Sequence, residues 1–79
     1  MKNNIKFCFG KVANCKSLDL RSNPSINSKV ICTLFPGTEV IIEDDPVSLK
    51  TDWIKICTVS GVEGYAKDFY VSEVKMNER

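Results

Sequence analysis

The side chains with the most potential for chemistry in this sequence are aromatic. The 79 residues contain no His, which removes Ser-His-Asp and Cys-His catalytic sets and the commonest zinc ligand. Because Ile54 and Ile56 share one strand face, Trp53 is expected on the opposite face, pointing outward at least in part. An exposed Trp53 flanked by Tyr65 and Tyr70 would form a platform for an extended peptide. The alternative, that Trp53 closes one end of the core, stays equally open, and packing is the more ordinary role for both tyrosines.

Acidic and sulfur ligands give weaker signals. Asp44, Asp45 and Asp52 could hold a hard cation such as calcium, but the EF-hand pattern with its bidentate Glu is missing. A solvated acidic loop is the favoured interpretation. With no Gly-rich phosphate loop either, no metal, no cofactor and no enzymatic activity are expected.

The four cysteines are spread along the chain without a CxxC pair. Since the sequence begins with no recognisable export signal, free thiols that act as small hydrophobic side chains are favoured over two disulfides. A four-cysteine zinc site would need paired close spacings, and a nucleophilic cysteine would need a His partner, so both are disfavoured. The cysteines are Cys8, Cys15, Cys32 and Cys57.

Composition indicates one small globular domain. Apolar residues make up 43% and charged residues 27%, and 11 Lys and Arg against 10 Asp and Glu give a net charge of +1. This balance disfavours nucleic acid or an anionic membrane as a partner. No apolar run is long enough to cross a bilayer or to act as a signal peptide, so the cytoplasm is the expected site of synthesis and residence.

Period-two patterns predict an all-β fold of short strands separated by turns. Strong turn signals occur at residues 22–28, at Pro36-Gly37 and at Ser60-Gly61. Residues 67–70 look like a single helical turn. The expected strands cover residues 5–11, 18–20, 30–34, 38–43, 53–59, 62–66 and 71–74.

Three segments, in order and in register, resemble the bacterial SH3 (SH3b) family. The first two are LDLRSNPS at residues 18–25 and SKVICTLFPGTEV at residues 28–40. The third is WIKI at residues 53–56, followed by GVEGYA at residues 61–66. Together they cover most of residues 12–74.

The resemblance implies a small SH3-like barrel of five to seven short antiparallel strands with one 3-10 turn near residues 67–70. Its parts would be an added N-terminal strand at residues 1–11, the barrel at 12–74 and a flexible tail at 75–79. Asn23 stands where the family usually has Gly, so a positive φ is expected there. The expected core is Leu18, Leu20, Val30, Leu34, Val40, Ile42, Ile54, Ile56 and Ala66.

The resemblance also implies a binding module that catalyses nothing. The ligand-binding candidates are Trp53, Tyr65, Tyr70 and Arg21, although in the family the arginine more often braces the following loop through backbone carbonyls. The expected partner is an extended peptide or protein, as in assembly of a phage or prophage particle. The alternative is peptidoglycan, bound at the cell wall as the targeting module of a lytic enzyme. Self-association through the N-terminal strand is a further expectation.

Overall fold

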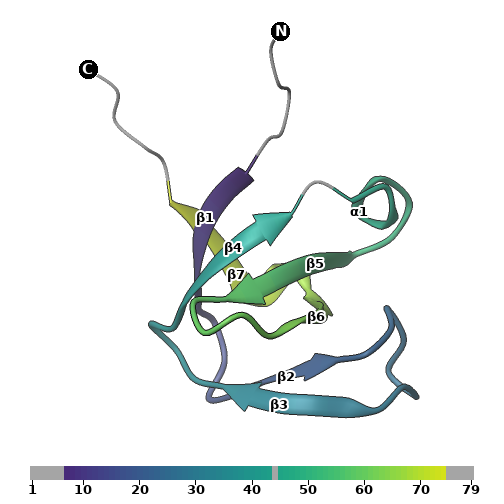
Figure 1. The fold of residues 1–79 in the computed structure, drawn as a ribbon, viewed down its shortest axis with the longest axis horizontal. Helices are drawn as coiled ribbons and strands as arrows, with labels where there is room; N and C mark the ends of the chain where they lie inside the picture. The colour runs from purple at the N-terminus through teal and green to yellow at the C-terminus, as the bar shows by residue number, and fades with distance from the viewer. Residues whose placement is uncertain (1–6, 44, 75–79) are drawn as a thin grey trace, which may run out of the picture.

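The computed structural model describes residues 7–43 and 45–74, which form one antiparallel sheet of seven short strands (Figure 1). The sheet order is β3-β2-β6-β5-β4-β1-β7. This all-β architecture confirms the predicted SH3-like barrel, with a sheet that is strongly coiled but not closed. The strands are β1 (Phe7–Val12), β2 (Leu18–Arg21), β3 (Val30–Leu34), β4 (Glu39–Glu43), β5 (Trp53–Thr58), β6 (Glu63–Lys67) and β7 (Val71–Val74).

Two glycine turns join neighbouring strands at the predicted places. Gly37 lies between β3 and β4 with φ +90°, and Gly61 lies between β5 and β6 with φ +99°. Both angles fall where a Cβ is unfavourable, so glycine suits these turns. Asn23 does not have a positive φ. Asn14, in the loop after β1, has one instead, at φ 64°.

The N-terminal strand is integrated into the sheet. β1 pairs with β4, with Phe9 opposite Ile41, and on its other side with β7, with Phe9 opposite Val74. From Phe9 to Lys11 both edges of β1 are therefore occupied by strands, which leaves no free edge there for a second copy to pair with. Self-association through the N-terminal strand stays a prediction, and Phe9 on this strand is 46% exposed. The predicted strand residues 5 and 6, like the predicted tail at 75–79, lie outside the described residues.

The buried core agrees with the predicted set apart from three positions. It comprises Val12, Leu18, Leu20, Leu34, Val40, Ile54, Ile56 and Ala66. Ile42 is only partly buried against it, and Val12 was not predicted. The prediction for Val30 was wrong, since its side chain is 39% exposed. A bulge between Leu20 and Arg21 shifts the β2–β3 register, so that Val30 lies opposite Arg21 and not opposite an inward residue.

Two short helical turns complete the fold. The long connection before β5 contains α1 (Val47–Lys50), which the sequence pattern did not predict. The predicted turn after β6 is the 3-10 helix η1 (Asp68–Tyr70), which leads into β7. In the described part of the chain, neither element approaches the length and apolarity that a membrane-spanning helix needs.

Candidate functional site

Trp53 lies at the start of β5, on the sheet face opposite Ile54 and Ile56, as predicted, but it does not point freely into solvent. Its side chain is only 8% exposed. Lys67, its register partner on β6, places Nζ 5.4 Å from the ring centroid. The prediction of an exposed Trp53 was therefore wrong, because a neighbouring strand and the loops around the ring cover it. Trp53 contributes the floor of a cleft.

Lys67 is held above Trp53 by an acidic neighbour. Its Nζ lies 3.1 Å from Asp52 Oδ2, and the Asp68 backbone N–H donates to the Asp52 carbonyl at 2.9 Å. The Lys67 hydrogen bond is the main reason that the pKa of Asp52 is lowered. Asp52 is thus an ion-pair partner, in contrast to the calcium ligand considered from the sequence. Asp44 lies outside the described residues.

Tyr70 and Phe69 belong to η1, which is tied to the loop after β1. The Asn14 side chain donates to the Phe69 carbonyl at 3.0 Å, and the Ala13 backbone N–H donates to the Tyr70 carbonyl at 2.9 Å. The two aromatic rings meet edge-to-face with centroids 5.2 Å apart. Phe69 remains 67% exposed, so this bracing presents a large apolar side chain to solvent.

Arg21 ends β2 and braces the loop at residues 22–28, as the resemblance implied. Its Nη1 donates to the Ser28 carbonyl at 2.8 Å, and its Nη2 lies 3.5 Å from Asp19 Oδ2. Hydrogen bonds within the loop stabilise it further, since the Ser28 hydroxyl donates to the backbone carbonyls of Asn23 and Ser25. These contacts fix Ile26, which is 65% exposed at the tip of the loop.

Two adjacent hollows lie among these elements. One of about 310 Å³ has Trp53, Arg21 and Asn14 among its lining residues. The other, of about 340 Å³, has Phe69, Asp52 and Asp68 among its own. The hollows share three lining residues and are therefore adjacent, and we refer to the two together as the Trp53 groove. The shared residues are Ile26, Lys67 and Tyr70.

The Trp53 groove brings together three of the four predicted ligand-binding residues, Trp53, Tyr70 and Arg21. Sequence reasoning missed Ile26, Phe69 and Asn14. The positions of these residues depend on how two loops and η1 meet, and no spacing pattern encodes that meeting.

Tyr65, the fourth candidate, is not among the residues that line the Trp53 groove. It lies on β6 opposite Lys55 of β5, next to a cluster of charged side chains. Lys55 Nζ is 3.7 Å from Glu43 Oε1 and 3.9 Å from Glu63 Oε1. Glu63 first, then Glu43, then Tyr65 raise the pKa of Lys55.

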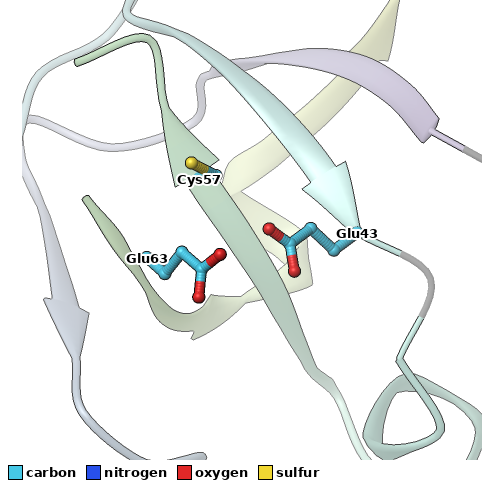
Figure 2. A group of neighbouring side chains, drawn as sticks. All are labelled: Glu43, Cys57 and Glu63. Atoms are coloured by element: carbon cyan, nitrogen blue, oxygen red, sulfur yellow. The ribbon is translucent and has the colours of Figure 1, made fainter. Parts of the chain in front are cut away.

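The same cluster is the strongest metal-like grouping in the described part of the chain. Glu43, Cys57 and Glu63 come from three neighbouring strands, and their ligand atoms lie within 4.8 Å of one another (Figure 2). The Lys55 ammonium already forms ion pairs with both carboxylates, so a cation would have to compete with it. The arrangement is that of a surface ion-pair network.

The cysteines have different surroundings. Cys15, Cys32 and Cys57 carry free thiols, and Cys15 and Cys32 pack against the core as small apolar side chains. The Cys57 thiol donates to the carbonyl of Thr58 at 3.3 Å.

A small coiled β-sheet with an aromatic groove between its loops is the architecture of an SH3-like binding module. A sequence model described as the bacterial SH3 domain matches residues 16–72, which is most of the chain. The chain therefore belongs to the bacterial SH3 family, a family of binding domains that are generally non-catalytic. A search of curated proteins found no match.

Proposed function

We propose that the chain is a non-catalytic module that binds an extended peptide segment of a protein partner in the Trp53 groove. The observation that carries this proposal is that two adjacent hollows meet at Ile26, Lys67 and Tyr70. Two adjoining hollows suit a chain of residues, whereas a small substrate would call for one enclosed pocket. Ile26 and Phe69 are exposed enough to pack against incoming apolar side chains.

The charges along the groove support a peptide over a polyanion. Arg21 and Lys67 are already paired with Asp19 and Asp52, and Asp68 adds a further negative charge. Nucleic acid would require unpaired cations in a row. A peptide can pair its apolar groups with Ile26 and Phe69, its amide groups with Asn14 and its charged groups with the ion pairs of the groove.

Neither of the two resolved pKa shifts among the described residues moves a group towards neutral pH. The pKa of Asp52 is lowered and that of Lys55 is raised, so both groups are more firmly charged at neutral pH. General acid–base catalysis requires the opposite, a pKa brought towards the working pH.

The proposed setting is assembly of a larger particle, such as that of a phage or prophage, in which small modules join structural proteins. The alternative is targeting of a lytic enzyme to peptidoglycan at the cell wall. The same groove would serve, because peptidoglycan carries stem peptides with amide and charged groups. In the proposal of particle assembly, the chain is synthesised in the cytoplasm.

The test uses the wild-type chain and two substitutions at the rim of the groove. Peptides selected from a random display library and, separately, purified peptidoglycan are the probes. Phe69→Ala and Ile26→Ala should weaken binding of the selected peptide by tenfold or more, with backbone NMR shifts centred on Tyr70. Phe35→Ala and Val59→Ala are the matched controls, since Phe35 is 61% and Val59 76% exposed away from the groove.

Co-sedimentation with peptidoglycan that Phe69→Ala abolishes and Phe35→Ala preserves would favour the wall-targeting alternative. The proposal is overturned if peptide binding leaves the NMR signals of the groove unchanged. It is also overturned if the rim variants bind as tightly as the controls.

A further inference from the structure

Most charged side chains of the Trp53 groove form ion pairs with one another. In the hollow next to the Trp53 ring, Arg21 Nη2 lies 3.5 Å from Asp19 Oδ2. In the other hollow, which we call the η1 hollow, Lys67 Nζ lies 3.1 Å from Asp52 Oδ2. Both cations that line the groove are therefore compensated within the chain.

Asp68 carries the charge that these ion pairs leave over. It lines the η1 hollow, and among the described residues no cation lies within ion-pair distance of its carboxylate. Lys67, which lines the same hollow, contacts Asp52 and the Trp53 ring instead. The groove thus has two cations against three carboxylates, and the excess negative charge lies in the η1 hollow.

An exposed aromatic ring lies next to this carboxylate. Phe69 follows Asp68 in η1, lines the same hollow and is 67% exposed. Its ring meets that of Tyr70 edge-to-face, and the Asn14 side chain donates to its backbone carbonyl at 3.0 Å. Because these contacts restrict Phe69 before a ligand arrives, less conformational entropy is lost on binding.

A carboxylate beside an aromatic ring favours a cation, and the groove already contains one example. The Lys67 ammonium lies 3.1 Å from Asp52 Oδ2 and 5.4 Å from the centroid of the Trp53 ring. Asp68 and Phe69 offer the same two kinds of group to a ligand. A guanidinium group suits them best, because it is planar, stacks on aromatic rings and donates two parallel hydrogen bonds to a carboxylate.

We propose that the η1 hollow binds a basic side chain of the partner peptide, preferably arginine, through the Asp68 carboxylate and the Phe69 ring. This inference rests on the proposed function, since it names one residue class within the peptide that occupies the Trp53 groove. Both contacts lie near solvent, so together they should strengthen binding by about threefold to tenfold. An acidic residue in the same position would be repelled by Asp68, so the hollow also contributes to specificity.

The first test compares selections from one random peptide display library on the wild type, Asp68→Asn and Glu73→Gln. Peptides selected on the wild type should share an arginine or lysine at one position, and Asp68→Asn should lose this preference. Glu73→Gln is the matched control, because Glu73 is an exposed carboxylate on β7 that is not among the lining residues of either hollow. It should retain the preference.

A double-mutant cycle then locates the contact. Replacing the peptide's arginine by citrulline, which has nearly the same shape without the charge, should weaken binding to the wild type by about threefold to tenfold. The same replacement should leave binding to Asp68→Asn nearly unchanged, because the partner charge is already removed. Fluorescence of Trp53, the single tryptophan of the chain, measures the affinities.

Two outcomes overturn this inference alone, provided that Ile26→Ala still weakens peptide binding. One is equal affinity of the arginine and citrulline peptides for the wild type. The other is a selection that yields no shared basic residue, or one that yields it equally on Asp68→Asn. If no peptide binds, or if Ile26→Ala binds as tightly as the wild type, the proposed function is overturned and this inference with it.

Discussion

The ammonium group of Lys67 lies 5.4 Å from the centroid of the Trp53 ring, across the β5–β6 pair. This contact covers the ring from the β6 side, and Trp53 is left only 8% exposed. The aromatic floor of the groove is therefore part of the packing of the barrel. Its contribution to stability and its contribution to binding must be separated experimentally.

Trp53→Ala should lower the free energy of unfolding by roughly 3–5 kcal/mol, because it removes a large buried ring and leaves a cavity. Trp53→Phe should lower it by less, since an aromatic ring remains. Urea unfolding followed by circular dichroism measures both. Loss of ligand binding in Trp53→Ala would then report unfolding, which is why the rim residues Phe69 and Ile26 are the better probes of binding. A Trp53→Ala variant as stable as the wild type would contradict the packing described for this ring.

Lys67→Met should raise the pKa of Asp52 towards its ordinary range, because the hydrogen bond from Lys67 is the largest cause of the lowering. A lowered carboxyl pKa stabilises the fold above the unfolded-state pKa, and that stabilisation is lost as the pH falls through the folded-state pKa. The stability difference between wild type and variant should therefore shrink on acidification below about pH 4. Carbon-detected NMR titration of the Asp52 carboxyl group measures the pKa. Lys16→Met is the control and should leave it unchanged.

Glu63→Gln should lower the raised pKa of Lys55, since Glu63 is the largest cause of the shift. Glu43→Gln should lower it by less, although Glu43 lies slightly closer, at 3.7 Å against 3.9 Å. A lysine whose pKa is raised in the folded state stabilises the fold at pH values below its unfolded-state pKa. This stabilisation is lost as the pH rises through the folded-state pKa. The effect on stability should thus disappear at strongly alkaline pH. Nitrogen-detected NMR of the Lys55 ammonium measures this pKa in both variants. A larger fall in Glu43→Gln than in Glu63→Gln would contradict the prediction.

Gly64→Ala should destabilise the fold by roughly 1–3 kcal/mol through overpacking. A Cβ at this position would lie 2.7 Å from Leu20 Cγ and 2.8 Å from the Arg21 carbonyl oxygen. Gly37→Ala is the contrasting variant, because nothing lies within 4 Å of its Cβ and only its φ of +90° is unfavourable. Its effect should be about 1 kcal/mol from backbone conformation alone. Thermal unfolding of the two variants side by side separates crowding from strain.

The sequence was sufficient to predict the strands, because alternation of apolar and polar residues is a local property. Leu18, Leu20, Ile54 and Ile56 were all assigned to the core from strand spacing together with the family resemblance, and all are buried. The turns at Gly37 and Gly61 were also predictable, since glycine there meets a local backbone requirement. The prediction for Val30 failed because a bulge, with Ile31 as the extra residue of β3, breaks the alternation of this strand, and the sequence pattern does not show where a strand is bulged.

The site was only partly predictable. Trp53, Tyr70 and Arg21 were selected by residue type and do meet in one groove, while Tyr65 was selected on the same grounds and lies beside Lys55 instead. Residue type indicates what a side chain can do, but not which neighbours it will have. Ile26, Phe69 and Asn14 have no distinguishing type, and only the packing of loops against η1 gives them a place in the groove.

By itself, the sequence determined the class of fold, most of the core and the absence of a histidine-based catalytic set, because these follow from residue types and short-range periodicity. Only the tertiary structure decided that Trp53 is covered by Lys67, that both edges of β1 are occupied and that the uncharged β3 lies at the margin of the sheet. These relationships join residues far apart in the chain. They are fixed by strand order and register, which depend on the free energy of the whole folded sheet and on no single segment.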